Sequence, residues 1–190
     1  MRKIIVSEFI TLDGVIEDPG GAEKFERGGW AFQFERGPEG DKFKLDEVLA
    51  AGAMLLGRVT YQGFAEAWPS RIGDFADKMN GMPKYVVSST LKEGSWANTK
   101  VIGNQVAQQV SGLKAMPGGD ILVAGSARLV SSLMEYDLVD EYRLMLYPVV
   151  LGKGKRLFTD ASSRHALQLV EVKPVGGGIL ILIYHPLINK

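Results

Sequence analysis

At residues 54–61 the chain reads Met54-Leu55-Leu56-Gly57-Arg58-Val59-Thr60-Tyr61, an apolar run that ends at a glycine and is followed at once by an arginine and a hydroxyl. Such a run between polar flanks predicts a buried strand, and the spacing from Val59 to Trp68 predicts a helix. Gly57 would therefore lie where a strand ends and a helix begins. In open α/β sheets ligands bind at this junction, because unpaired N–H groups at the helix start face the crevice beyond the strand. The stretch predicts an anion-binding corner for a phosphorylated cofactor.

The same pattern recurs twice further along the chain. The predicted strand 84–89 ends in Ser88-Ser89, and the predicted strand 120–124 is followed by Gly125-Ser126-Ala127-Arg128 and a predicted helix, 129–134. Three strands thus end in Gly, Ser or Thr before the chain turns. Because the carboxyl ends of parallel strands meet at one edge of a sheet, this pattern indicates a dinucleotide laid across that edge.

Composition limits the classes of function. The 190 residues carry 22 basic and 22 acidic side chains without long blocks of either sign, which gives no electrostatic basis for binding nucleic acid or an anionic membrane. The chain has no cysteine, so disulfides, thiolate zinc sites and cysteine nucleophiles are excluded. No apolar run is long enough for a signal peptide or a membrane span. We expect a cytoplasmic protein that forms a single domain over residues 1–190.

The amino-terminal region combines a strand with a long irregular segment. Residues 2–9 predict a first strand, and the Asp13-Gly14 pair that follows is typical of a tight turn. Residues 15–40 are rich in glycine and contain Trp30, Phe32 and Phe34 without clear periodicity, which is long for a loop in a compact domain. The aromatic residues would either form a lid over a flat ring or fill the core from above.

The carboxyl-terminal third predicts antiparallel strands. A strand over 141–151, interrupted at Pro148, precedes a hairpin of strands 167–172 and 179–185, so the sheet is expected to be mixed. The glycines and cations of residues 151–158 do not meet the spacing of a Walker motif, which needs Ser or Thr after its lysine. The remaining segments predict a strand over 99–102 and helices over 41–51, 71–79 and 105–113.

Five motifs together resemble the dihydrofolate reductase-like superfamily, and more narrowly the riboflavin-pathway pyrimidine reductases, whose domain is the RibD C-terminal domain, and their stand-alone bacterial relatives. The resemblance covers essentially the whole chain. It implies a three-layer α/β/α sandwich around a mixed, mostly parallel sheet of about eight strands with a carboxyl-terminal antiparallel hairpin, and NADPH bound across the strand ends. The motifs are Leu12-Asp13-Gly14, Gly57-Arg58-Val59-Thr60-Tyr61, Val86-Val87-Ser88-Ser89, Val123-Ala124-Gly125-Ser126 and Pro148-Val149-Val150-Leu151-Gly152-Lys153-Gly154.

The resemblance implies a set of cofactor-binding residues. Arg58, with Ser88 and Ser89, would meet the 2′-phosphate of NADPH, because a guanidinium bonds phosphate in bidentate fashion. Thr60 and the backbone N–H groups of Gly125, Ser126, Ala127 and Arg128, at the start of a helix, would hold the pyrophosphate. A surface salt bridge for Arg58 and strand-end capping by the serines are the alternatives. The implied set is Gly14, Gly57, Arg58, Val59, Thr60, Ser88, Ser89, Gly125, Ser126, Ala127, Arg128 and Leu129.

Two carboxylates are candidates for assisting protonation of the substrate. Asp41 occupies the position at which dihydrofolate reductases carry their single carboxylate, although a helix-start aspartate is also an ordinary N-cap. Asp13, at the end of the first strand, is the competing candidate. The substrate would contact Trp30 and the loop Gly152, Lys153 and Gly154, with Lys155 and Arg156 available for a phosphate or simply solvated. His165 and His185 lack partners for a metal, so no metal site is expected.

Two functions from different classes remain. The first is an NADPH-dependent reductase of a flat heterocycle, of the 5-amino-6-(5-phosphoribosylamino)uracil reductase type in riboflavin biosynthesis, or alternatively of the dihydrofolate or pteridine reductase type. The second is a nucleotide-binding relative without turnover. The apolar run 179–184 lacks alternation, which predicts burial on both faces by the chain's own helices or by a second subunit, and we expect a homodimer.

Overall fold

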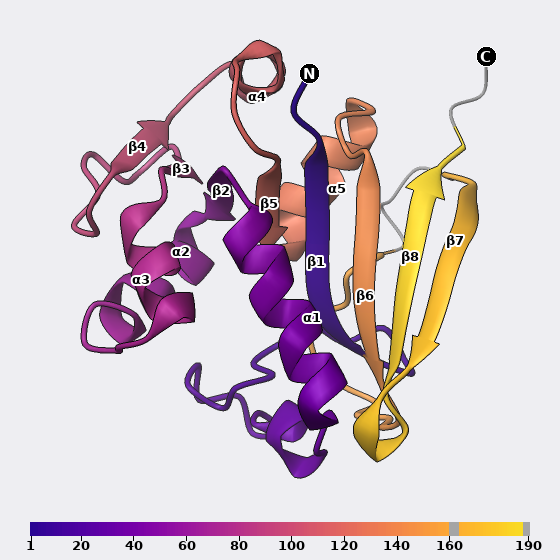
Figure 1. Ribbon diagram of the computed structural model, residues 1–190. Coiled ribbons are helices and arrows are strands. Elements are labelled where there is room, and N and C mark those ends of the chain that lie inside the picture. Colours follow the sequence, from indigo (N-terminus) through magenta and orange to yellow (C-terminus); the bar gives the residue numbers. More distant parts are fainter. Residues whose placement is uncertain (160–163, 188–190) are drawn as a thin grey trace.

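One eight-stranded sheet runs through the whole protein (Figure 1). The computed structural model describes residues 1–159 and 164–187, and the strands lie in the order β4-β3-β2-β5-β1-β6-β8-β7. The pairs from β4 to β6 are all parallel, whereas β8 pairs antiparallel with both β6 and β7. The predicted mixed sheet with a carboxyl-terminal hairpin is therefore confirmed. A single domain over residues 1–190 stays a prediction.

The strands follow the apolar runs closely. Each predicted strand is present, and most bounds lie within two residues of the prediction. The largest difference is at β6, which ends before Pro148 because proline cannot donate to the ladder. The strands are β1 Ile4–Thr11, β2 Ala53–Gly57, β3 Lys84–Val87, β4 Thr99–Ile102, β5 Ile121–Ala124, β6 Glu141–Tyr147, β7 Leu167–Pro174 and β8 Leu180–Pro186.

The helices lie on both faces of the sheet, which gives three layers (Figure 1). In the part of the chain that the structure describes, none of them combines the length and apolar character needed to cross a membrane. The α-helices are α1 Gly37–Ala50, α2 Arg58–Ala67, α3 Asp74–Gly81, α4 Val106–Ala115 and α5 Ala127–Glu135, and two short 3-10 helices are η1 Trp30–Gln33 and η2 Gly176–Gly178.

Strand β1 shows how the two cores are separated. Successive side chains of a strand point to opposite faces of the sheet, and Ile4, Val6 and Ile10 belong to the core under α4 and α5. Ile5 belongs instead to the core that includes residues of α1, α2 and α3. The central strands are thus apolar on both faces, as expected for parallel strands covered by helices.

Helix α1 begins earlier than the sequence predicted. Its first residue is Gly37, with Pro38 in the first turn and Arg36 at the N-cap position. Proline suits a first turn, because its φ is already helical and its missing N–H is not needed there. Asp41 consequently lies inside the helix, and the interpretation of Asp41 as an N-cap was wrong.

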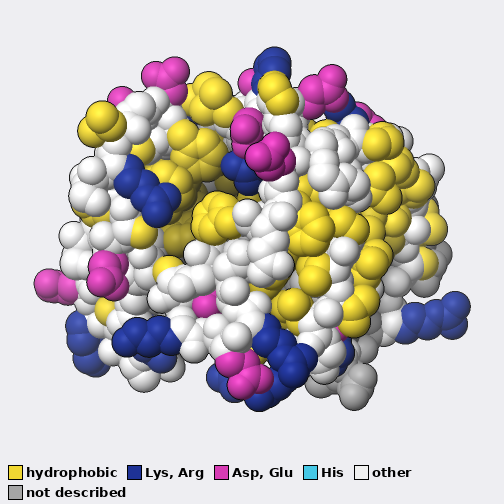
Figure 2. Space-filling view, turned by 90° about the horizontal axis from the view of Figure 1, so that it is seen from below, with side chains coloured by type: hydrophobic (Ala, Val, Ile, Leu, Met, Phe, Trp, Pro, Cys, Tyr) yellow, Lys and Arg dark blue, Asp and Glu magenta, His cyan; other side chains and the backbone are white. Residues whose placement is uncertain are grey.

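The hairpin of β7 and β8 is covered less than its apolar sequence suggested. Ile181 is buried, but the side chains of Leu182, Ile183 and Tyr184 are only partly buried, so burial on both faces by the chain's own helices was wrong. On the edge strand β7, Leu169 and Val172 are 48% and 47% exposed. Apolar side chains therefore remain exposed on this edge of the sheet. Hydrophobic side chains also gather at the right of Figure 2.

Candidate functional site

The turns that follow β2 and β5 lie in contact with each other. The two strands are parallel neighbours, so Gly57 and Gly125 reach the same edge of the sheet. A Cβ on Gly57 would lie 2.7 Å from Ser126 Cβ, and a Cβ on Gly125 would lie 2.8 Å from Thr60 Oγ1. Gly125 also has a φ of +72°, which favours glycine. Both glycines are thus required by the close approach of the turns, which sets Ser126 against Gly57 and Thr60 against Gly125.

Arg58 begins α2 at this edge with its side chain in solvent. Its Nη1 donates to Gln62 Oε1 at 3.0 Å, and the described residues, 1–159 and 164–187, offer it no carboxylate. The alternative role of Arg58, a surface salt bridge, is therefore not seen among the described residues. Since Gly57 pairs in register with Val87, Arg58 and Ser88 start the turns of neighbouring strands. Two residues that bind the same phosphate group would have to lie on neighbouring turns in this way.

Ser88 and Ser89 differ in their surroundings. Ser88 is buried, and its hydroxyl oxygen accepts from the N–H groups of Thr90 at 3.2 Å and Leu91 at 2.9 Å. It therefore caps the turn after β3, and its hydroxyl also lies 3.4 Å from Thr90 Oγ1. Ser89 is exposed. The two serines lie at the predicted edge, with Ser88 engaged in capping.

The start of α5 presents backbone rather than side chains. Ser126 is the N-cap residue with a φ of 70°, and its carbonyl accepts from Val130 N–H at 3.0 Å. The first N–H groups of a helix have no acceptor within it and carry partial positive charge. The side chain of Leu129 is 5% exposed and packs in the core, so Leu129 can face a ligand only through its backbone. This helix start suits an anion.

A buried carboxyl, Glu8, lies beside the Gly125 turn. Glu8 is 6% exposed, it accepts a hydrogen bond from Gly125 N–H, and its Oε1 has no hydrogen-bond partner among the described residues. The Gly125 N–H, which the sequence analysis assigned to the pyrophosphate, is thus already engaged by Glu8. Burial raises the pKa of Glu8 to about 8, although the Gly125 N–H and Lys44 oppose the shift. Sequence analysis did not single out this residue. The sequence pattern could have identified it, because every second residue from Ile4 faces the core and Glu8 stands in that series with Val6 and Ile10.

A cleft of about 340 Å³ opens next to the start of α1. Arg36 and Asp41 form an ion pair in it, with 2.5 Å between Nε and Oδ1, and the hydroxyl of Tyr147 bonds Arg36. Seen from the edge where the parallel strands end, the surface is hollowed and hydrophobic side chains line the hollow (Figure 2). The cleft combines aromatic side chains with one charged pair, a lining that suits a flat polar ring. Its residues are Ala31, Phe32, Phe34, Glu35, Arg36, Gly37, Pro38, Asp41 and Tyr147.

Trp30 fills the core beneath this cleft. It is fully buried, its Nε1 donates to the Glu17 carbonyl at 2.9 Å, and its ring meets Tyr147 edge-on at 5.3 Å between centroids. Of the two predictions for the aromatic segment, a lid or a filling of the core, the second applies to Trp30. The side chain of Phe32, in contrast, is 78% exposed at the cleft. Phe32 and Phe34 are therefore the aromatic residues of the segment that reach the cleft.

Asp13 holds the glycine-rich loop after β6 in place. Its carboxylate accepts from Leu151 N–H at 3.1 Å, from Gly152 N–H at 2.7 Å and from the Thr11 hydroxyl at 2.6 Å. Desolvation raises the pKa of Asp13, but these hydrogen bonds outweigh it and the pKa is lowered overall. Gly14 completes the predicted tight turn with its N–H on the Thr11 carbonyl, at 2.9 Å. Asp13 is thus ionised at neutral pH and bound to backbone.

The cations of the same loop also have carboxylate partners. Lys153 Nζ lies 2.8 Å from Glu26, Lys155 pairs with Glu17, and Arg156 Nη2 lies 3.7 Å from Asp13. We call Asp13, Glu17 and Glu26 the carboxylate clasp. Gly154 approaches Val15 so closely that a Cβ would lie 2.6 Å from Val15 Cγ1. A substrate phosphate at this loop would have to replace the clasp carboxylates as partners of the cations.

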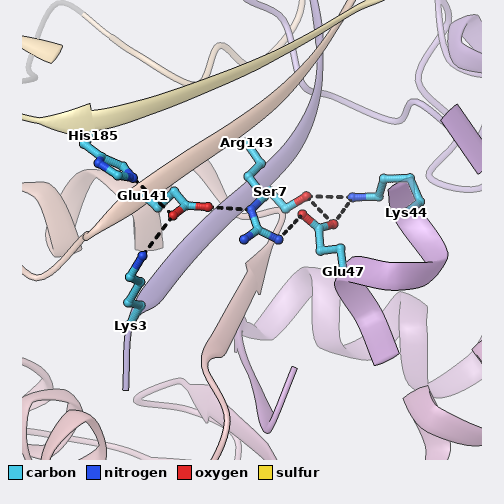
Figure 3. Close-up of polar contacts among 7 residues, drawn as sticks. All are labelled: Lys3, Ser7, Lys44, Glu47, Glu141, Arg143 and His185. Carbon is cyan, nitrogen blue, oxygen red and sulfur yellow. Dashed lines mark hydrogen bonds and ion pairs between the residues drawn. The ribbon is translucent and has the colours of Figure 1, made fainter. Parts of the chain in front are cut away.

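The histidines contact carboxylates. His185 Nε2 lies 3.2 Å from Glu141 Oε2, at one end of a chain of polar contacts between the sheet and α1 (Figure 3). His165 Nδ1 lies 3.9 Å from Asp137 Oδ1. Within residues 1–159 and 164–187, no three acidic, histidine or cysteine side chains gather as metal ligands would.

Comparison with known proteins places this geometry in a family. The model of the RibD C-terminal domain matches residues 2–181. The uncharacterized protein YyaP of Bacillus subtilis (strain 168) is 30% identical over 190 residues, covering 97% of this chain and 95% of that protein.

Two solved structures share the fold. A putative riboflavin biosynthesis protein from Shewanella sp. PV-4 superposes with a TM-score of 0.76 at 20% identity, covering 97% of this chain and 98% of that one. Dihydrofolate reductase from Enterococcus faecalis, complexed with NADP(H) and RAB-propyl, superposes with a TM-score of 0.61 at 12% identity, covering 97% of this chain and 96% of that one. The predicted dihydrofolate reductase-like fold is confirmed.

Replacing Asp13 with asparagine tests the clasp. We expect Asp13→Asn to lower the free energy of unfolding at pH 7 by about 1.5–3 kcal/mol, because hydrogen bonds to a charged group contribute on that order. Since the pKa of Asp13 is lowered in the folded protein, its stabilisation is present above the ordinary carboxyl pKa of about 4 and is lost as pH falls through the lowered value. Urea denaturation at pH 7 and below pH 4 measures both effects.

The matched control is Glu26→Gln, which removes a solvent-exposed clasp carboxylate and should leave the free energy of unfolding unchanged within error. Equal stability of Asp13→Asn and the wild-type protein at pH 7 would contradict the clasp.

Proposed function

The chain belongs to the RibD C-terminal domain family, and we propose that it is an NADPH-dependent reductase of a small flat heterocycle. The observation that carries this proposal is the contact between the turns at Gly57 and Gly125, which gathers Arg58, Thr60 and the start of α5 at one edge of the sheet. When bound, NADPH supplies a hydride, and the protein supplies orientation, a proton source and a dry pocket.

The crevice at this edge fits a doubly phosphorylated nucleotide. Neither Gly57 nor Gly125 has room for a Cβ, so neither turn carries a side chain at its glycine. Arg58 carries a charge without a carboxylate partner in the described residues and would read the 2′-phosphate, while Thr60 and the N–H groups of residues 126–128 would hold the pyrophosphate. The full proposed set is Gly14, Gly57, Arg58, Val59, Thr60, Ser88, Ser89, Gly125, Ser126, Ala127, Arg128 and Leu129.

The cleft beside α1 is the proposed substrate site. Phe32 and Phe34 would cover a flat ring, and the ion pair of Arg36 and Asp41 would bond its polar edge. Family membership favours the 5-amino-6-(5-phosphoribosylamino)uracil reductase type, whose phosphate would be met by Lys153 beside Gly152 and Gly154. The carboxylate of Asp41 in the cleft favours the alternative, a dihydrofolate or pteridine reductase. Trp30 would support the site from below.

Of the two candidate carboxylates, we propose Asp41 for assisting protonation. Asp41 lines the cleft, whereas Asp13 is committed to the backbone of the loop after β6. A proton donor near neutral pH needs a carboxyl that can take up a proton there, and the lowered pKa of Asp13 opposes this. We assign Asp13 the role of holding the loop.

We also propose a homodimer that buries the exposed apolar residues of the β7–β8 hairpin, including Leu169 and Val172. Edge strands with apolar side chains are commonly covered by another chain. In sedimentation velocity at micromolar concentration, the dimer would appear at twice the monomer mass of 20.7 kDa. A single species at the monomer mass would exclude the homodimer.

A cytoplasmic location of the protein stays a prediction.

Loss of Arg58 should weaken binding of NADPH but not of NADH. We expect Arg58→Ala to reduce the affinity for NADPH by about 1.5–3 kcal/mol, or roughly ten- to a hundredfold, because only NADPH carries the 2′-phosphate. Titration calorimetry with both nucleotides measures the difference. The matched control is Gln62→Ala, which removes the hydrogen-bond partner of Arg58 without removing charge. Equal losses for both nucleotides would assign Arg58 another role.

Loss of the Asp41 carboxylate should affect turnover more than stability. With dihydrofolate and a pyrimidine panel as substrates, we expect Asp41→Asn to slow NADPH oxidation by about a hundredfold or more, the usual contribution of a positioned acid or base. The Asp41 side chain is 64% exposed, so the free energy of unfolding of Asp41→Asn should differ little from that of the wild-type protein. Glu39→Gln alters an exposed carboxylate on the same helix and should retain the wild-type rate. If Asp41→Asn oxidises NADPH as fast as the wild-type protein, Asp41 does not take part in the mechanism. If the wild-type protein binds NADPH but oxidises it with no substrate of the panel, the protein is better described as a nucleotide-binding relative without turnover.

A further inference from the structure

Strand β1 carries two adjacent polar residues, Ser7 and Glu8, whose side chains point to opposite faces of the sheet. On the side of α1, Ser7 belongs to a paired network (Figure 3). Its hydroxyl donates to Glu47 Oε2 at 2.7 Å, Lys44 Nζ lies 2.5 Å from the same oxygen, and Arg143 Nη1 lies 3.6 Å from Glu47 Oε1. The charges on this face are thus matched by opposite charges.

Glu8, on the other face, has no oppositely charged partner within residues 1–159 and 164–187. It lies opposite Leu144 of β6 and in the alternation of the apolar side chains that pack under α4 and α5. The charged groups that act on Glu8 are Lys44 and Glu47, both from α1, and they pair with each other. A carboxylate without a cation in an apolar interior is strongly disfavoured. Glu8 is therefore a neutral carboxylic acid at pH 7.

The position of this acid matters for the proposed cofactor. Glu8 bonds Gly125 N–H, and the turn at Gly125 leads directly into the start of α5, where the pyrophosphate would be held. An ionised Glu8 would place a buried negative charge next to the phosphates, and like charges raise the cost of ionisation further. A neutral Glu8 keeps the hydrogen bond to the turn without that repulsion.

We propose that Glu8 is a positioning residue that supports the Gly125 turn in its protonated form, so that NADPH binding is coupled to proton uptake at Glu8. The inference rests on the proposed function, because it requires the cofactor at this edge of the sheet. It adds a residue that contributes to cofactor binding through the turn rather than by contact.

The coupling has a defined size and direction. Free Glu8 titrates at a pKa of about 8, so it is mostly neutral at pH 7 and mostly ionised at pH 9. If only the neutral form binds, linkage predicts an NADPH dissociation constant about tenfold larger at pH 9 than at pH 7, and uptake of about half a proton per NADPH at pH 8. The 2′-phosphate contributes little, because a phosphate monoester with a pKa of about 6 is already about nine-tenths ionised at pH 7.

The experiment is titration calorimetry of the full chain with NADPH at pH 7, 8 and 9, for the wild-type protein and for Glu8→Gln. Glutamine has the size of the neutral acid and keeps an acceptor for Gly125 N–H, but it cannot ionise. Burial also lowers the pKa of Lys84 on β3 to about 8. Both proteins carry Lys84, so the difference between their pH profiles isolates Glu8. We expect the NADPH affinity of Glu8→Gln to change by no more than about twofold between pH 7 and pH 9, where that of the wild-type protein changes about tenfold.

A second measurement needs no variant. At pH 8, the binding heat of the wild-type protein in two buffers of different ionisation enthalpy gives the protons taken up, and uptake near zero would overturn the proposal. A tenfold loss in Glu8→Gln equal to that of the wild-type protein would overturn it as well. These outcomes are distinct from failure of the proposed function, which would appear as no NADPH binding at pH 7.

Discussion

The close approach of the turns after β2 and β5 is the constraint on which the site depends. The strands are parallel neighbours in the centre of the sheet, and each turn packs against a side chain of the other, Ser126 on Gly57 and Thr60 on Gly125. A side chain at either glycine would force the turns apart and rotate the starts of α2 and α5. The constraint therefore acts on two helix starts at once, and it keeps their free N–H groups directed at one place.

Charge pairing distinguishes the cations of this edge. In a chain with 22 basic and 22 acidic residues, a cation that already faces a carboxylate carries little information about ligands. Lys153, Lys155 and Arg156 all face the carboxylate clasp, whereas Arg58 bonds only the neutral Gln62 among the described residues. The clasp orders the loop after β6, and Arg58 is left to meet an anion from outside.

The sequence predicted the fold well where local patterns determine it. The strand ends at Gly57 and Gly125 follow from apolar runs that stop at glycine, and the hairpin follows from consecutive strands without a helix between them. The start of α1 was missed because Pro38 was not weighed as a first-turn residue. The partners of Asp13 were beyond prediction, since Leu151 and Gly152 lie more than 130 residues away and only the assembled sheet brings them near.

Glu8 illustrates a different limit, because its pattern was visible but its meaning depended on three-dimensional surroundings. A polar residue in a central strand is costly unless it is paired, and Ser7 meets that condition through Glu47 and Lys44. Glu8 meets it only in part: one oxygen accepts from Gly125 N–H, and the other has no hydrogen-bond partner in the part of the chain that the structure describes. An apolar residue at position 8 would remove the cost of burying the carboxyl, yet it would leave the Gly125 N–H without its acceptor beneath the turn. The buried acid and the glycine turn therefore form one unit, and a local departure from good packing of this kind is expected where a fold builds a binding site.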